Sequence, residues 1–321
     1  MSKKLYAIGE ALIDFIPMES GRTLKQVSGF RPAVGGAPAN VCGAFSKLGG
    51  ASAMITQLGK DPFGDKIVEE FEKNNIDCSH ISRTQRANTS LAFVALKEDG
   101  NREFSFYRKP GADMLMDEKQ IKKSWFEDAF ALHFCSVSIG DFPMRNAHEV
   151  AINYALECGA LISFDPNLRY ALWKDERDLK KAVLEFLPKA HIIKISDEEL
   201  EFITGKNNIE AALPQLFVGN VKMVIYTAGA NGAYGYVREG KINSHAPGYR
   251  VKAYDTTGAG DGFIGSFLFQ LYEANINTQN IEAITAKQLE KFLDFSNKFC
   301  AISVMKPGAI DSYPSLEQMK N

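Results

Sequence analysis

An acidic residue next to three small ones is the feature of this sequence that points most directly to chemistry. Gly258-Ala259-Gly260 precede Asp261, and apolar residues recur at helical spacing from Phe263 to Leu271. Small residues let the backbone approach a ligand closely, and the free amides at the start of a helix favour negative charge. The stretch therefore predicts a cradle for a phosphate or an oxyanion.

Asp261 is the unexpected member of this stretch, because a carboxylate would repel a bound phosphate. A base that removes the proton from a hydroxyl beside the phosphate would explain its position. An acid in the first turn of a helix can also simply complement the helix dipole. Taken together with the glycines, the pattern favours the catalytic role.

A second glycine-rich turn lies far upstream. Gly35-Gly36-Ala37-Pro38-Ala39-Asn40 leads into an alanine-rich segment that predicts a helix ending near Gly49. The glycines permit close approach of a ligand, and Asn40 offers both a donor and an acceptor to a polyol. A tight turn with Pro38 at the helix start and an exposed Asn40 fits equally well. The residues of this turn leave both interpretations open.

The elements that must position these two turns are indicated by periodicity. Between residues 129 and 195, near-continuous apolar strands alternate with helices, which is typical of a parallel, doubly wound α/β sheet. Ligands bind at the carboxyl ends of such strands, so Asp14, which closely follows a first strand at residues 5–9, is a candidate for a polar contact. Within the alternating region, strands are expected at 130–135, 161–164 and 192–195, and helices at 144–157 and 178–187.

Two segments do not fit the alternating pattern. Residues 14–34 are broken by prolines and glycines, and residues 89–110 read as a hairpin turning at Asp99-Gly100. Together they predict a small β-sheet that stands off the main body as a lid. We therefore expect residues 1–321 to form one α/β domain carrying this lid.

Later strand ends carry further polar clusters, at Asp165–Arg169 and Lys194–Glu199. The second cluster contains a capping box, Ser196 with Glu199, which is the stronger local interpretation. A glycine turn over 227–232 fits a phosphate contact and a simple hairpin comparably well. The remaining expected elements are a hairpin of 233–238 and 241–245 turning at Glu239-Gly240, a strand at 249–254, and a long helix over 284–305.

Composition narrows the class of partner. With 45% hydrophobic and 24% charged residues, the 321-residue chain resembles an ordinary globular protein, and its net charge of −2 argues against nucleic acid or an anionic membrane as a partner. No signal peptide or membrane span is apparent, so we expect a cytoplasmic protein that acts on a small molecule. The cysteines are odd in number and lack C-x-x-C spacing, which favours reduced thiols: Cys42, Cys78, Cys135, Cys158 and Cys300.

The two glycine motifs together, Gly35–Asn40 followed by Asp255–Asp261, resemble the PfkB/ribokinase family of sugar kinases. The resemblance continues through 165–169, 194–202 and 306–309, and covers essentially the whole chain. Within the family, the segments 92–94, 102–108 and 111–115 are most similar to those of fructokinases. The resemblance implies a ribokinase-like fold and ATP-dependent phosphorylation of the 6-hydroxyl of fructose.

The resemblance also implies residue roles. Asp261 matches the general base, and Gly258, Ala259 and Gly260 match the anion hole. Positions that contact the sugar are matched by Asp14, Gly35, Gly36, Asn40, Arg108 and Arg169. Positions that contact the nucleotide are matched by Lys194, Thr227, Gly229, Gly232, Asn297 and Ala301.

Metal sites follow from the same resemblance, whereas assembly is inferred from the lid. Glu199 matches a position that acts on Mg²⁺ through water, whereas Ser196 stands where the broad family has Asn. An apolar outer face of the lid would favour a homodimer. In the same resemblance, a K⁺ site is matched by Asp255, Thr257, Ser303, Lys306, Gly308 and Ser312.

Two alternatives to a fructokinase stay open. One is a kinase for ribose, 2-keto-3-deoxygluconate or an adenosine-like nucleoside, and the other is a sugar sensor without catalysis.

Overall fold

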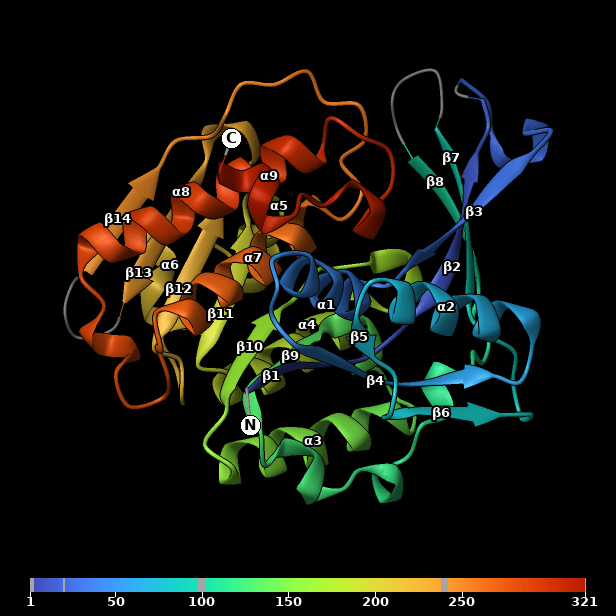
Figure 1. The fold of residues 1–321 in the computed structure, drawn as a ribbon, viewed down its shortest axis with the longest axis horizontal. Helices are drawn as coiled ribbons and strands as arrows, with labels where there is room; N and C mark the ends of the chain where they lie inside the picture. Colours follow the sequence, from blue (N-terminus) through green and yellow to red (C-terminus); the bar gives the residue numbers. More distant parts are fainter. Residues whose placement is uncertain (1–2, 20, 97–101, 238–241, 321) are drawn as a thin grey trace.

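A large twisted sheet organises the molecule, which is described by a computed structural model covering residues 3–19, 21–96, 102–237 and 242–320 (Figure 1). The strand order is β14-β13-β12-β11-β10-β9-β1-β4-β5, and β6 also pairs with β4. All pairs are parallel except β12 with β13 and β13 with β14. The strands are β1 (Lys4–Ile8), β4 (Ser52–Gly59), β5 (Ile76–Asp77), β6 (Ile81–Thr84), β9 (Ala129–Cys135), β10 (Leu161–Asp165), β11 (Ile192–Ser196), β12 (Met223–Thr227), β13 (Ala233–Val237) and β14 (Ile242–Ala246).

Helices cover both faces of this sheet because its strands are apolar on both sides. Along β1, Leu5 and Ala7 belong to one hydrophobic core, whereas Tyr6 and Ile8 belong to the other. The first core packs under α1, α2, α7 and α8, and the second under α3 to α6. The helices are α1 (Ala37–Lys47), α2 (Pro62–Lys73), α3 (Met144–Glu157), α4 (Glu176–Phe186), α5 (Asp197–Thr204), α6 (Ile209–Leu216), α7 (Ala259–Glu273), α8 (Ala286–Ser303) and α9 (Leu316–Lys320).

A separate four-stranded sheet stands off the main body, at the upper right of Figure 1. Its order is β3-β2-β7-β8, and stacking of Phe15 on Phe93, with ring centroids 4.5 Å apart, joins β2 to β7. This confirms the predicted small sheet, although its turn at Asp99-Gly100 lies outside the described residues, as does the turn at Glu239-Gly240. The strands are β2 (Leu12–Pro17), β3 (Phe30–Gly35), β7 (Leu91–Leu96) and β8 (Arg102–Tyr107).

The predicted mainly parallel, doubly wound α/β fold is confirmed, but one expected strand was wrong. Residues 249–254 form a loop, and every one of them is exposed. The loop is held by the N–H groups of Tyr254 and Asp255, which both donate to the carbonyl of Val304. β-forming residues do not make a strand without a neighbour to pair with and a face to bury. The short strands β5 and β6 had no sequence signal strong enough to predict them.

No helix in the described ranges is both long and apolar enough to cross a lipid bilayer. The cytoplasmic location stays a prediction from the sequence.

Candidate active site

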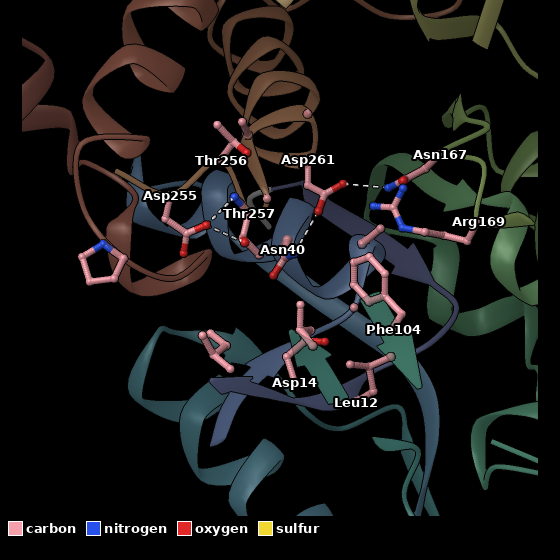
Figure 2. Close-up of a pocket in the computed structure, with 18 of the residues that line it drawn as sticks. Leu12, Asp14, Asn40, Phe104, Asn167, Arg169, Asp255, Thr256, Thr257 and Asp261 are labelled. Carbon is pink, nitrogen blue, oxygen red and sulfur yellow. Dashed lines mark hydrogen bonds between the residues drawn. The ribbon is translucent and has the colours of Figure 1, made fainter. Parts of the chain in front are cut away.

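A pocket of about 1050 Å³ opens between the small sheet and the carboxyl ends of the main strands. Figure 2 shows Leu12, Asp14 and Phe104 rising from the small sheet toward Asp261 at the start of α7. The two motifs meet here, because the Asn40 Nδ2 donates to Asp261 Oδ2 at 2.8 Å across 221 residues of sequence. The early glycine turn and the late acid therefore share one cavity.

Asp261 is buried at the base of this pocket, with 6% of its surface exposed. Its Oδ1 accepts a hydrogen bond from Asn167 Nδ2 at 3.0 Å, so an amide holds each carboxylate oxygen (Figure 2). Burial raises the pKa of Asp261 above the ordinary range, although the Asn40 bond and the positive charges of Arg169 and Lys194 oppose the shift. The result is a fixed carboxylate that is readier to accept a proton than a free one.

The start of α7 supplies the expected anion cradle. Gly258 is the N-cap of the helix in the left-handed region, with φ of 73°, and a Cβ there would lie 2.7 Å from Ala309 Cβ. The Ala259 N–H donates to the carbonyl of Thr256, whereas the N–H groups of Gly260 and Asp261 donate to no residue in the described part of the chain. Two free amides at a helix N-terminus are donors for a phosphoryl oxygen.

Lys194 adds a positive charge beside this cradle. Its Nζ lies 2.9 Å from Asp165 Oδ2, and it is 3.2 Å from the point where a Cβ on Gly260 would stand. Burial lowers the pKa of Lys194, but the nearby carboxylates of Asp165 and Glu199 outweigh that effect and leave the pKa above its ordinary value. The ammonium group therefore stays charged next to the free amides.

The glycine turn before α1 shapes the opposite wall. A Cβ on Gly35 would lie 2.1 Å from Asp14 Oδ2, and a Cβ on Gly36 would lie 2.4 Å from the carbonyl of Glu10. Only glycines therefore allow Asp14 and the start of α1 to pack so closely. Asn40 is buried, and its Oδ1 has no hydrogen-bond partner among the described residues. That oxygen is an acceptor suited to a ligand hydroxyl.

The two arginines expected near the substrate lie in different places. Arg169 lines the pocket and is drawn close to Asp261 in Figure 2. Arg108 is not among the lining residues, because its guanidinium is buried against Asp113, with Nη2 to Oδ2 at 2.5 Å and Nε to Oδ2 at 2.8 Å. The structure thus brings only one of the two to the cavity.

The residues expected to contact a nucleotide lie beside the pocket, at the edge of the main sheet that carries β12 to β14. Thr227 is paired with Ser196 at the carboxyl ends of β12 and β11. On α8, Asn297 Nδ2 donates to the carbonyl oxygens of Ala246 and Pro247 at 2.9 and 3.2 Å. Apart from Lys194, none of this set lines the pocket: Thr227, Gly229, Gly232, Asn297 and Ala301.

The predicted capping box is confirmed at the start of α5. Glu199 Oε2 accepts from Ser196 N at 2.8 Å, and Oε1 accepts from Leu168 N at 2.9 Å. Each oxygen keeps one lone pair for a further donor or a water-bound ion. Mg²⁺ in kinases is typically held by one or two carboxylates, waters and phosphates, so this single carboxylate fits the expected donor set.

Three of the residues proposed for a monovalent cation, Asp255, Thr257 and Gly308, are joined by hydrogen bonds where two loops meet. Asp255 Oδ1 accepts from the N–H and hydroxyl of Thr257, and Asp255 Oδ2 accepts from Gly308 N at 2.9 Å. Lys306 N donates to the carbonyl of Ser303, and the Ser312 hydroxyl donates to the carbonyl of Ala309. The oxygens of Asp255 could contribute to a K⁺ site here.

Sequence reasoning missed several residues of the site. Asn167 belongs to the polar cluster at 165–169, and its place two residues after a buried strand is a signal for a role in the site. It adopts the left-handed region, with φ of 43°, which asparagine tolerates. Tyr313 gave no local signal, since its hydroxyl reaches the carbonyl of Gly258 at 2.7 Å from 55 residues away.

The chain is similar to known proteins in sequence and in fold. The model of the "pfkB family carbohydrate kinase" matches residues 2–316. A probable fructokinase-2 from Arabidopsis thaliana is 42% identical over 311 residues, which cover 96% of this chain and 92% of that protein. A fructokinase from Xylella fastidiosa with bound ATP superimposes with a TM-score of 0.92 at 31% identity, covering 100% and 98% of the two chains. A Vibrio cholerae O395 fructokinase with fructose, ADP and calcium gives 0.86 at 31% identity, covering 99% and 98%.

Proposed function

This chain belongs to the pfkB family of carbohydrate kinases, and from that premise we propose that it is an ATP-dependent fructokinase. The reaction would convert D-fructose and ATP into D-fructose 6-phosphate and ADP. The observation that carries the proposal is the meeting of Asp261, Asn40 and the free amides of α7 in one pocket. Fructokinases of similar sequence and structure support fructose as the sugar.

Asp261 would act as the general base. The primary hydroxyl of the sugar would lie against its carboxylate, which takes the hydroxyl proton as the oxygen bonds to the γ-phosphoryl group and the bond to ADP breaks. Asn40 and Asn167 fix the carboxylate while it accepts that proton. The raised pKa of Asp261 favours this transfer relative to an exposed carboxylate.

The transferred group would be stabilised by donors that are already in place. The N–H groups of Gly260 and Asp261 and the ammonium of Lys194 converge beside the base. Such fixed donors stabilise charge in the transition state without reorganising. Ala259 contributes backbone shape to this cradle rather than a donor, because its N–H is already used by Thr256.

Sugar recognition would fall to the opposite wall. Asp14 and the unpartnered Oδ1 of Asn40 would contact hydroxyls, and Arg169 would lie near the reacting end. Arg108 would act from behind this wall and not on the sugar. The small sheet would serve as a lid that excludes water during transfer.

Ions and assembly are further parts of the proposal. Glu199 would hold Mg²⁺ through water, and the ion would neutralise charge on the phosphates of ATP when bound. The 255–257 and 303–312 loops would hold K⁺. We also propose a homodimer formed through the outer face of the lid sheet, where Tyr107 is 65% exposed.

An assay of ADP release by the purified chain with Mg²⁺ tests this function. Fructose, ribose, 2-keto-3-deoxygluconate and adenosine are compared, and the position of the phosphate is read by NMR. Fructose should give the highest kcat/KM and carry phosphate on its 6-hydroxyl. A higher kcat/KM with another acceptor would reassign the substrate. Fructose binding without phosphate transfer at any Mg²⁺ concentration would favour a sugar sensor.

A further inference from the structure

A buried carboxylate in the wall of the pocket has no role in the chemistry described so far. Glu10 is the second residue after β1, is 3% exposed and is among the residues that line the pocket. Its Oε1 accepts from Ala37 N at 3.2 Å, and its Oε2 accepts from the Ser138 hydroxyl at 2.8 Å. Burying a charged carboxylate is costly unless its partners hold it well, so these bonds define where Glu10 sits.

The bond to Ala37 matters because Ala37 is the first residue of α1. Its N–H is one of the donors that a helix cannot satisfy internally, and Glu10 is its partner. Gly36, which precedes the helix, has a φ of 112° that residues with a Cβ rarely adopt, so its backbone does not by itself continue into the helix. Glu10 therefore fixes the direction in which α1 leaves the glycine turn.

Asn40 is one turn further along the same helix. Its backbone N–H bonds to the carbonyl of Gly36 at 2.9 Å, and its side chain donates to Asp261 at 2.8 Å. Any rotation of the first turn of α1 therefore moves the amide away from the carboxylate. Because a misplacement of about 1 Å can cost about 10²-fold in rate, the hold on Ala37 has consequences for catalysis.

The Ser138 hydroxyl links Glu10 to the guanidinium of Arg108. Arg108 Nη2 lies 3.4 Å from the Ser138 hydroxyl, which in turn donates to Glu10. Burial raises the pKa of Glu10, and the charge of Arg108 opposes that shift. Since Arg108 directly follows β8 of the small sheet, the network reaches from the lid to the start of α1.

We propose that Glu10 is a positioning residue for phosphoryl transfer, which holds the first turn of α1 so that Asn40 stays aimed at Asp261. The proposal rests on Asp261 being the base of the proposed function. Because the two oxygens of Glu10 already accept from Ala37 N and the Ser138 hydroxyl, we assign it a role through Ala37 and Asn40 and not on the substrate itself.

The test follows the ionisation of Asp261 directly, by carbon-13 NMR of its side-chain carboxyl, assigned from the signal that Asp261→Asn removes. Two variants are compared with the wild type. Glu10→Ala removes the acceptor for Ala37 N, whereas Glu10→Gln keeps an acceptor oxygen and removes only the charge. Asn74→Ala is the matched control, because Asn74 is 5% exposed, bonds to the carbonyl of Glu70 at 2.8 Å and lies outside the pocket lining.

In Glu10→Ala the hydrogen bond from Asn40 should weaken, and that bond lowers the pKa of Asp261. The titration midpoint of Asp261 should therefore move to higher pH, and kcat should fall by about 10- to 100-fold. In Glu10→Gln, the titration midpoint of Asp261 and kcat should both be closer to their wild-type values. Asn74→Ala should lower Tm and leave the titration midpoint unchanged. The other charged and titratable groups around Asp261 are unchanged in all these variants, so they do not account for a difference in its titration midpoint. They are Arg169, Lys194, Glu199, Asp165, Cys135, Cys300 and Tyr313.

Two outcomes would overturn the proposal. If Glu10→Ala lowers Tm but leaves the titration midpoint of Asp261 at its wild-type pH, Glu10 is a purely structural residue. A midpoint that moves to lower pH would mean that Glu10 acts only as a nearby negative charge. A wild type that transfers no phosphate would count against the proposed function, while the NMR titration would still decide the role of Glu10.

Discussion

The protein has two buried ion pairs, one beside Asp261 and one behind the pocket, and their cations differ in how many N–H donors remain free for a ligand. Lys194 pairs with Asp165 at 2.9 Å, and Arg108 pairs with Asp113 at 2.5 Å. The side chains are almost equally buried, with exposures of 6% and 1% in the first pair and 3% and 1% in the second. Burial and distance alone therefore do not separate a functional pair from a structural one.

Donor counting does separate them. Lys194 has three N–H donors, and among the described residues its one hydrogen bond goes to Asp165. The N–H groups of Arg108 donate to the Asp113 carboxylate, to the carbonyl of Val137 and to the Ser138 hydroxyl. Lys194 also lines the pocket, whereas Arg108 does not. The first pair has capacity for an anionic ligand, and the second holds the wall together.

Breaking the first pair should give the larger loss of activity. Lys194→Met should lower kcat by about 10²–10³-fold, because a fixed positive charge beside the transferring phosphoryl group is lost. Lys194→Met with Asp165→Asn removes the unpaired buried carboxylate as well. The double variant should regain stability in urea unfolding while its kcat stays low. If the double variant recovers kcat as well as stability, the role of Lys194 is structural.

Breaking the second pair should affect stability first. Arg108→Met leaves the Asp113 carboxylate buried without its partner, which should cost about 3–5 kcal/mol of unfolding free energy. Replacing both residues, as Arg108→Met with Asp113→Leu, should recover most of this loss, since apolar substitutes for a buried pair are often neutral. We expect kcat of the double variant to stay within about tenfold of wild type, because the acceptor for Ala37 remains.

The Arg108 result has a clear counter-outcome. If Arg108→Met unfolds at the wild-type urea concentration but loses fructose affinity, the guanidinium contacts the sugar in solution. The sequence-based assignment of Arg108 as a sugar contact would then be right, and the buried geometry would describe a different state.

The two pairs also mark how far sequence reasoning reaches. Periodicity predicted the strands around Asp165 and Lys194, and glycine patterns predicted the start of α7. A resemblance in motif could not show that Arg108 turns away from the cavity, because that depends on Asp113 and Ser138 arriving from other segments. The exposed loop at 249–254 was misread as a strand for the same reason, since only tertiary contacts decide whether β formers find a partner.

The central claim is that Asp261 accepts the sugar proton, and Asp261→Asn tests it most directly. Turnover of fructose and fructose affinity are measured on the same preparation, the latter by calorimetry. We expect kcat to fall by about 10²–10⁴-fold while the Kd for fructose and the Tm stay close to wild type, because an amide keeps the shape but cannot take the proton. Near-normal turnover in this variant would contradict the account.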